Sequence, residues 1–472
     1  MMMMMGSLTA ALLLLLSAAP GTNAQAKLQV NLDSTDSIKS AAKTVAANLW
    51  AYYDGDKPGR TPGILPGPPP AGDYYWWQAG AMWGTLIDYW HYTRDATYND
   101  ETVRSIVFQA DAPRNAFMPS NWTASLGNDD QGFWGMAAML AAEVNFPNPT
   151  GPNDPGYLAL AQAVFNTQAA RWETSFCNGG LRWQVPHTNG GYNYKNTIAN
   201  VVFLNIAARL ARYTKNGTYA EWAERAWDWT EAVGYIKPDF NVVDGAHTEH
   251  NCTDVNEVQW SANAAVLVHG AAIMYNYTEA PKWRTRTAGL LNRTVEHFFP
   301  EGIMIERPCE LPDRVQCNVD QHSFKGYMHR ALASVAVVAP FTRSSIMPVL
   351  RSSTKGAVSS CLADGTCGFR WNTGDYDGDK SRGPAGQQMS ALAALSTLLL
   401  DQKHVELGPL TNETGGTSKG DAAAGIGEYQ EAQPMRKVTA GDKAGAAFVT
   451  LVVLGSFLGS LVWLNVGWGE KK

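Results

Sequence analysis

The stretch Gly127-Asn128-Asp129-Asp130-Gln131-Gly132-Phe133-Trp134-Gly135-Met136-Ala137-Ala138-Met139-Leu140-Ala141-Ala142-Glu143 joins two neighbouring aspartates to an apolar run of small residues. The run has the composition of a helix that is packed on all sides. Asp129 and Asp130 fall where this helix begins. Adjacent carboxylates repel each other and lose hydration on burial, so they would destabilise a folded core. Helix capping is the ordinary explanation, and cleavage of a glycosidic bond by an acid and a nucleophile is the alternative.

Helical spacing of apolar residues continues on both sides of this stretch. It predicts helices over 36–54, 76–92, 99–110, 130–144, 155–175, 195–214, 219–233, 257–277, 281–298, 321–338, 341–353 and 385–400. Strand signals are few, and 302–307 is the short candidate. Alternate helices, which open at Trp76, Asp130, Lys195, Glu257, Gln321 and Ala385, are rich in small residues, and the intervening helices carry more charge. This alternation predicts an all-α (α/α)6 toroid, or barrel, of about twelve helices; a superhelical stack of helix pairs is the alternative.

In such a toroid the inner helices expose their N-termini at one mouth, where a cavity lies. This position changes the interpretation of Asp129 and Asp130, because a cap needs one side chain and three polar residues stand here in a row. Glycoside cleavage with retention needs two carboxyls roughly 5–5.5 Å apart. Helix N–H groups favour the charged form of one carboxyl, and proximity to that charge keeps the proton on the other.

Polar and aromatic residues near the other inner-helix starts are expected to converge on the same space. They suit a sugar, because aromatic faces stack on its ring and neutral side chains pair with its hydroxyls, although core packing is the usual role of a single aromatic. The residues expected to bind substrate are Trp76, Trp77, Asn128, Tyr194, Asn196, Asp244 and Gln259. Asp244 is explained equally well as a turn residue. The segment 178–184 is expected to be a loop or short hairpin that walls the cleft.

Composition and motifs exclude several classes of function. The 472 residues carry a net charge of −6 and no stripe of Lys and Arg, so nucleic-acid binding has no support. Neither a P-loop, a Rossmann fingerprint nor a G-x-S-x-G motif occurs, and no cofactor is expected. The segment 247–250 is not the zinc motif H-E-x-x-H, and 375–379 lacks the glutamate that an EF-hand needs. We therefore expect no metal, with a looser calcium site or a plain turn left open at 375–379.

The N-terminus carries a secretion signal. A short apolar core at 12–16 precedes Ala24-Gln25-Ala26, an A-x-A cleavage pattern, so residues 1–26 are expected to be a signal peptide. Secretion permits disulfides among Cys177, Cys252, Cys309, Cys317, Cys361 and Cys367. Six cysteines allow fifteen pairings. Cys309–Cys317 and Cys361–Cys367 would close short loops and leave Cys177–Cys252. Metal ligation is the alternative, although no C-x-x-C spacing exists.

Six sequons agree with secretion and predict glycosylation of Asn121, Asn216, Asn251, Asn276, Asn292 and Asn412. After the body, expected over 27–405, a polar Gly/Ala-rich linker over 406–443 leads to an uncharged apolar stretch within 444–472. One interpretation is a glycolipid-anchor signal with its small-residue site near Ala423-Ala424-Gly425, which we favour. The other is a membrane span that leaves Glu470-Lys471-Lys472 in the cytoplasm. Either places the body outside, at the plasma membrane.

Three segments resemble glycoside hydrolase family 76: Trp76-Trp77-Gln78-Ala79-Gly80-Ala81-Met82-Trp83-Gly84, Gly127 to Trp134, and Tyr192-Asn193-Tyr194-Lys195-Asn196-Thr197. Specifically, they resemble the fungal glycolipid-anchored cell-wall branch, the mannan endo-1,6-alpha-mannosidases. The resemblance implies an (α/α)6 fold and retaining cleavage of α-1,6-mannose linkages, with Asp129 as nucleophile and Asp130 as general acid/base.

The same resemblance leaves the acceptor open. The expected substrate is α-mannan or the mannose of a glycolipid anchor, and the expected role is cell-wall biogenesis. A transglycosidase would instead move anchored glycoproteins onto a glucan acceptor in the wall, with a sugar hydroxyl in place of water. A non-catalytic, carbohydrate-binding wall protein is the third hypothesis. We expect a monomer.

Overall fold

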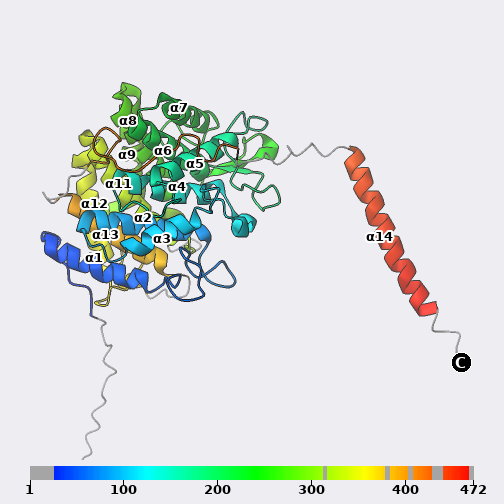
Figure 1. Ribbon diagram of the computed structural model, residues 1–472, viewed down its shortest axis with the longest axis horizontal. Coiled ribbons are helices and arrows are strands. Elements are labelled where there is room, and N and C mark those ends of the chain that lie inside the picture. Colours follow the sequence, from blue (N-terminus) through cyan, green and yellow to red (C-terminus); the bar gives the residue numbers. More distant parts are fainter. Residues whose placement is uncertain (1–25, 312–315, 378–382, 402–407, 428–439, 467–472) are drawn as a thin grey trace, which may run out of the picture. The chain divides into compact units, whose positions relative to one another are not determined.

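The structure is a computed structural model that describes residues 26–311, 316–377, 383–401, 408–427 and 440–466. Its body is a double ring of helices (Figure 1). The inner ring consists of α2 (Trp76–Thr93), α4 (Asn128–Glu143), α6 (Thr197–Thr214), α8 (Ser261–Thr278), α11 (Phe324–Val338) and α13 (Ala385–Leu398). Each of these helices contacts the next, and α13 returns to contact α2, so the ring is closed.

The outer ring consists of α1 (Thr35–Trp50), α3 (Asn99–Gln109), α5 (Tyr157–Ala170), α7 (Gly217–Ala232), α9 (Pro281–Phe298) and α12 (Arg343–Ser359). Each outer helix packs on an inner one, as α5 does on α4 and α7 on α6. This arrangement confirms the (α/α)6 toroid, including which helices are inner and which are outer. Shorter helices are η1 (Ser120–Ser125), η2 (Thr248–His250), η3 (Pro300–Gly302), α10 (Arg307–Glu310), η4 (Gln321–Ser323), η5 (Pro340–Thr342) and η6 (Leu399–Asp401).

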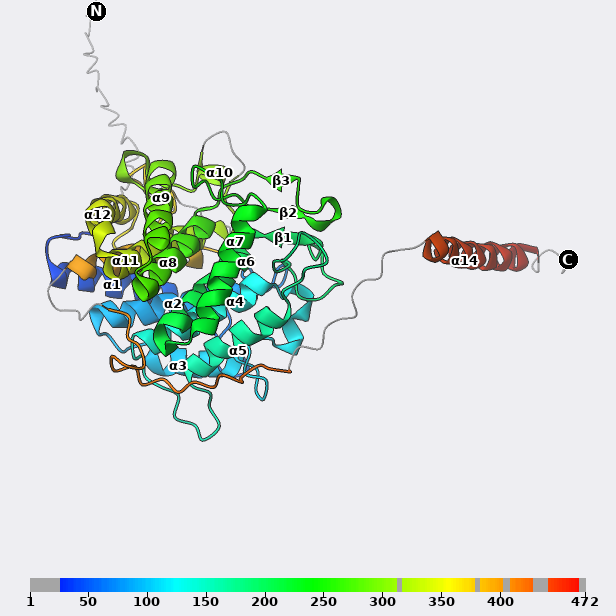
Figure 2. The ribbon, with the colours of Figure 1, turned by 90° about the horizontal axis from the view of Figure 1, so that it is seen from above.

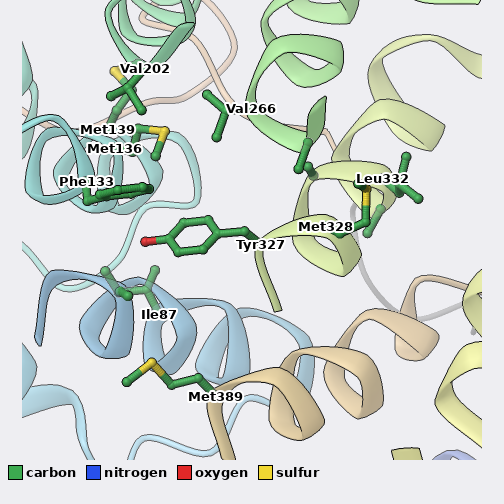
Figure 3. Packing of buried hydrophobic residues seen from close by; sticks show 14 of the residues in the cluster. Ile87, Phe133, Met136, Met139, Val202, Val266, Tyr327, Met328, Leu332 and Met389 are labelled. Carbon is green, nitrogen blue, oxygen red and sulfur yellow. The ribbon is translucent and has the colours of Figure 1, made fainter. Parts of the chain in front are cut away.

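Small residues on the inner helices allow the ring to close tightly. A Cβ at Gly132 of α4 would lie 2.2 Å from the Val202 side chain of α6, so this crossing requires glycine. Large side chains fill the ring's centre instead. Figure 3 shows the Tyr327 ring from α11 reaching between α2 and α4, and its centroid lies 5.0 Å from that of Phe133. The centre is therefore packed, which leaves the ends of the ring for binding.

A small antiparallel sheet stands beside the ring at the ends where α6 and α8 begin (Figure 2). Its order is β1 (Tyr194–Asn196), β2 (Gly245–His247) and β3 (Val255–Asn256). The strands are too short to show alternation in the sequence, so they were not predicted. The strand expected at 302–307 is wrong: this segment makes no sheet pairing, and its Ile305 N–H bonds to the Phe298 carbonyl instead.

Three disulfides join Cys177 to Cys252, Cys309 to Cys317 and Cys361 to Cys367, as the loop lengths suggested. The first ties the loop after α5 to the turn between β2 and β3 across 75 residues of chain. The other two close loops of 8 and 6 residues. All three bonds therefore lie outside the twelve helices of the two rings.

The segment 408–427, expected to be part of a linker, packs on the body. The Leu410 N–H bonds to the Glu143 carbonyl, and the Asn166 carboxamide of α5 donates to the carbonyls of Ala422 and Ala424 at 3.0 and 2.8 Å. A Cβ at Gly425 would lie 2.7 Å from the Ala163 carbonyl oxygen. The body therefore extends beyond residue 405, and packing on α5 explains the small residues near 425.

Beyond the body, α14 (Ala440–Val466) forms a separate unit. It is long and apolar enough to cross a membrane, with a mean hydropathy of 2.2 over Ala440–Leu464. Helices α11 and α12 follow each other in the chain and pass the same hydropathy test only as a pair with a bend of 117° between them. Both helices belong to the toroid. The expected signal peptide and the charged last residues lie outside the described residues.

All six sequon asparagines are exposed. Asn251 sits on the turn between β2 and β3, and its side-chain oxygen accepts the Cys177 N–H at 2.7 Å. The carboxamide nitrogen of Asn276 donates to the Val338 carbonyl, a bond that a glycan on this nitrogen would disturb. Glycosylation at these positions stays a prediction.

Candidate active site

A cavity of about 510 Å³ opens at the end of the toroid where the inner helices begin. Its walls come from the residues before or within the first turns of α2, α4, α6, α8 and α11. Seven residues predicted for the site line it together: Trp76, Trp77, Asp129, Asp130, Tyr194, Asn196 and Asp244. The side chains therefore meet where the toroid argument placed them.

Asp129 is held in the cavity wall by two donors. One carboxylate oxygen accepts the backbone N–H of Asp130 at 3.0 Å, and the other accepts the Asn196 carboxamide at 3.2 Å. Only 8% of the residue is exposed. Both contacts stabilise the charged form. The first follows from the location of Asp129 in the first turn of α4, where N–H groups lack helical partners, and the second comes from the residue that precedes α6.

Asp130 has a different environment. Its carboxylate accepts the backbone N–H of Gly127 at 2.6 Å, which is the reciprocal half of a capping box. A Cβ on Gly127 would lie 2.2 Å from Asp129 Oδ1 and 2.8 Å from Asp130 Oδ2. The glycine therefore lets both carboxylates pack over the start of the helix. A capping bond of the kind expected of Asn128 or Asp129 is therefore made by Asp130, which also lines the cavity.

The pKa values of the two carboxyls are displaced upward. Burial raises the pKa of Asp129 to about 7, against the hydrogen bonds from Asp130 and Asn196 that lower it. Burial and then the charge of Asp129 raise the pKa of Asp130 well above its ordinary value. A charge on Asp129 therefore favours retention of the proton on Asp130.

A third carboxylate, which the sequence analysis missed, lies in the same cavity. Asp320 precedes η4 and accepts the indole N–H of Trp77 at 3.2 Å. Burial raises the pKa of Asp320 to about 6. Its negative charge raises the pKa of both Asp129 and Asp130. Asp129 and Asp130 were identified as acids at the start of an inner helix, and the same rule applies to Asp320.

The cavity has further lining residues that were not among the individual residues predicted for the site. They are Tyr75, Ser125, Phe133, Trp183, Gln184, Asn189, Gly190, Ile198, Trp260, Ala262, Asn263, Gln321 and Phe324. Trp183 and Gln184 belong to the segment 178–184, which forms a loop that walls the cleft as expected. The backbone of Trp183 bonds to Asn128 and Tyr194, so this wall is fixed to both α4 and β1.

Two predicted residues do not line the cavity. The Asn128 carboxamide faces away from it, because it donates to the Arg182 carbonyl and accepts from the Arg171 guanidinium. Gln259 lies outside the cavity, and its neighbour Trp260 lines it. In the loop before α8, the residue that lines the cavity is thus Trp260, one position after the predicted Gln259.

Asp244 joins the cavity wall to the sheet. It accepts the Tyr194 hydroxyl at 2.8 Å and the Asn256 carboxamide at 3.2 Å. Burial raises the pKa of Asp244, and the bonds from Tyr194, Trp260 and Asn256 oppose that rise. The turn interpretation therefore does not account for this residue, which accepts hydrogen bonds from three elements.

Lys195 belongs to β1, whereas the sequence predicted that it begins the helix that is α6. Its side chain supports the loop that walls the cleft. Its buried ammonium donates to the carbonyls of Glu173, Phe176 and Gly179 at 3.1, 2.8 and 2.6 Å. It also pairs with the Glu173 carboxylate at 3.2 Å. These bonds fix the loop that leads to Trp183.

The segments set aside as poor metal motifs make ordinary contacts. His250 pairs with Asp254, and Asp377 accepts the N–H groups of Phe369 and Arg370. Within the described residues no group of three His, Cys, Asp or Glu is arranged to hold a metal ion.

Comparisons with known proteins agree with this geometry. A sequence profile of glycosyl hydrolase family 76 matches residues 37–413. The mannan endo-1,6-alpha-mannosidase DCW1 of Eremothecium gossypii is 42% identical over 97% of this chain and 99% of its own length. DCW1 of Saccharomyces cerevisiae is also 42% identical, over 96% and 98%.

Solved structures show the same fold. Dfg5 of Chaetomium thermophilum, in complex with glucosamine, is 50% identical and superposes with a TM-score of 0.80, covering 84% of this chain and 97% of that one. An inactive variant of the α-1,6-mannanase GH76A of Salegentibacter, in complex with α-1,6-mannotriose, is 15% identical with a TM-score of 0.61, covering 77% and 99%. With an acidic pair at the mouth of an (α/α)6 toroid and a family match over most of its length, this chain belongs to glycosyl hydrolase family 76.

Proposed function

We propose that this glycoside hydrolase is a retaining, endo-acting α-1,6-mannosidase of the fungal cell surface. The observation that carries the proposal is the unequal environment of Asp129 and Asp130 in one cavity. Two hydrogen bonds stabilise a charge on Asp129, and that charge keeps the proton on Asp130. The names of the fungal relatives supply the sugar and the linkage.

The first step would use both carboxyls at once. Asp129 attacks C1 of the mannose, the bond from C1 to the bridging oxygen breaks, and Asp130 gives its proton to that oxygen. The products are a mannosyl ester on Asp129 and a free hydroxyl on the departing sugar. The raised pKa of Asp130 suits this role because the proton must be present near neutral pH.

The second step would reverse these roles. Asp130, now a carboxylate, takes a proton from water as the water oxygen attacks C1. The ester bond breaks, and Asp129 is released as a carboxylate. Two inversions at C1 give net retention. Asn196 holds Asp129 in place through both steps.

A sugar hydroxyl in place of water would make the same site a transglycosidase. The lining of the cavity by Trp77, Trp183 and Trp260 supports this second candidate, because their rings offer stacking faces for an acceptor sugar beside the donor. Three indoles give more stacking surface than a single sugar needs. The acceptor would be a wall glucan, and the donor the mannose of a glycolipid anchor on a glycoprotein.

We also propose that the chain is secreted, glycosylated and monomeric, and that its C-terminus holds it at the outer face of the plasma membrane. The exposed sequon asparagines, the three disulfides and α14 support this location. A phospholipase specific for glycolipid anchors separates the two kinds of tail. Release of the protein from cells would indicate an anchor, and retention would indicate a span.

The proposed reaction is tested on α-1,6-mannan oligosaccharides. NMR of the first product should show the α-anomer, and Asp129→Asn and Asp130→Asn should each lower kcat by about 10³-fold or more. Asp36→Asn is a matched control, because Asp36 is an exposed aspartate in the first turn of α1. A β-anomer, or full activity in either variant of the pair, would overturn the mechanism. Adding glucan oligosaccharides to the same assay tests the second candidate, which requires a covalent mannose–glucan product.

A further inference from the structure

A second hollow, of about 610 Å³, adjoins the active-site cavity on its outer side. It is lined by Trp183, Gly191, Tyr194, Asp244, His247, Asp254, Val255 and Asn256. We call it the outer hollow. Trp183, Tyr194 and Asp244 line both spaces, so the two adjoin each other at these three residues.

The floor of the outer hollow is the small sheet. Tyr194 of β1 and His247 of β2 stand side by side with ring centroids 4.8 Å apart. Asn256 of β3 reaches back to Asp244, which the Tyr194 hydroxyl also bonds. Aromatic faces and a carboxylate with hydrogen-bonding neighbours thus occupy one surface.

Trp183 forms the boundary between the two spaces. It is among the few large apolar residues of the body that are exposed, with 37% of its surface open. A Cβ on Gly191, which has φ of +89°, would lie 2.4 Å from the Trp183 ring, so the glycine lets the loop pack against the indole. The indole therefore keeps a fixed orientation while one part of it stays open to solvent.

The sheet and its loops are held rigidly. Cys177–Cys252 fixes the turn between β2 and β3, and the Cys252 N–H bonds to the His247 carbonyl. The Thr248 N–H bonds to the Asn193 carbonyl beside β1. A surface built in this way loses little conformational entropy when a ligand binds.

We propose that the outer hollow is a second carbohydrate-binding region, which holds the sugar units next to those cleaved between Asp129 and Asp130. The inference rests on the proposed function and extends it. The ligand is an oligosaccharide chain, because indole, phenol and imidazole rings present stacking faces while Asp244, Asp254 and Asn256 offer partners for hydroxyls. Trp183, which lines both spaces, would contact the sugar chain where it passes from one to the other.

The test compares α-1,6-mannan oligosaccharides of increasing length. Wild-type kcat/KM should rise with length until the outer hollow is filled. Trp183→Ala and His247→Ala should each lower kcat/KM on the longest substrates by about tenfold more than on the shortest one, the loss carried by KM. Phe108→Ala is the matched control, because Phe108 is an exposed aromatic on α3, outside both cavities, and its variant should follow the wild-type curve.

Binding by the inactive Asp129→Asn protein supplies a readout that does not depend on turnover. Calorimetry with the longest oligosaccharide should give a Kd about tenfold weaker when His247→Ala is added. This readout keeps the proposal testable if Trp183→Ala fails to fold or if the substrate is not turned over. Equal losses of kcat/KM at every substrate length, or an unchanged Kd in the His247→Ala protein, would overturn the proposal that the outer hollow binds sugar units. A wild-type enzyme that binds the oligosaccharides without cleaving them would overturn the proposed function alone.

Discussion

The Asp129 carboxylate accepts the backbone N–H of Asp130 at 3.0 Å, so each aspartate acts on the state of the other. The amide of Asp130 stabilises a negative charge on Asp129, and that charge raises the pKa of the Asp130 carboxyl. Adjacent residues of the same type thereby have different environments. The proposed division of roles rests on their hydrogen bonds and not on their order along the chain.

Replacing Asp129 should stabilise the fold while removing activity. The pKa of Asp129 is raised from 3.8 to about 7 by burial, so the folded state resists its ionisation. The free energy of unfolding therefore falls as pH rises from about 4 to 7. Asp129→Asn should raise the free energy of unfolding by roughly 1–3 kcal/mol at pH 8, and by less at pH 4. Denaturant unfolding at both values measures this, with Asp36→Asn expected to change neither by more than about 0.5 kcal/mol. A loss of stability in Asp129→Asn at pH 8 would contradict the burial cost.

Activity should follow a bell-shaped pH profile whose position depends on Asp320. The acid limb reports ionisation of Asp129, near pH 7, and the basic limb reports loss of the Asp130 proton. The Asp320 charge raises the pKa of both groups, so Asp320→Asn should move both limbs to lower pH. The measurement is kcat/KM against pH. Asp244→Asn is the control, because Asp244 lines the cavity without contributing to either shift, and limbs that stay in place for Asp320→Asn would refute the coupling.

Gly127→Ala should disable the site without unfolding the protein. The new Cβ would lie 2.2 Å from Asp129 Oδ1 and 2.8 Å from Asp130 Oδ2, which forces both carboxylates to move. The backbone φ of −96° is accessible to alanine. We expect kcat to fall by about 10²-fold, because small misplacements of catalytic groups are costly.

Gly217→Ala is the matched control for this change. Gly217 opens α7, and a Cβ there meets nothing within 4 Å. Its kcat should equal that of the wild type. Circular dichroism should show both variants folded; wild-type activity in Gly127→Ala would mean that the close approach is not needed.

Lys195→Met should destabilise the protein by roughly 3–5 kcal/mol, because it leaves buried polar partners without a cation. The ammonium is the donor to three loop carbonyls and the partner of Glu173. Lys43→Met, at an exposed position of α1, should change stability by less than about 0.5 kcal/mol. Denaturant unfolding measures both. Equal stability of the two variants would show that Lys195 does not hold the loop.

The toroid was predictable because burial on all sides leaves a strong mark on composition. The helices that begin at Trp76, Ser261 and Ala385 are rich in small residues, and this separates inner from outer helices. The acidic pair followed from its place at a helix start. Disulfide pairing followed from loop length for Cys309–Cys317 and Cys361–Cys367, which left one remaining pair.

What the sequence did not reveal depends on side-chain direction and on long-range contacts. Asn128 precedes the pair in the chain, yet its carboxamide turns to Arg171 and Arg182, away from the cavity. The place of Asp320 at the start of an inner helix could have been predicted, but its contact with Trp77, 243 residues away in the chain, could not. The strands of the sheet are two or three residues long, too short for a period-two pattern.

The most direct test of the central claim, that Asp129 is the nucleophile and Asp130 the acid/base, is azide rescue of the two alanine variants. The substrate is an α-1,6-mannobioside with an activated aryl leaving group, which needs no acid. Azide should restore turnover in Asp130→Ala by attacking the mannosyl ester on Asp129, and the product should be the α-mannosyl azide. In Asp129→Ala azide should occupy the place of the missing carboxylate and give the β-mannosyl azide. NMR of the products distinguishes the two anomers, and the opposite pairing of variant and anomer would contradict the assignment.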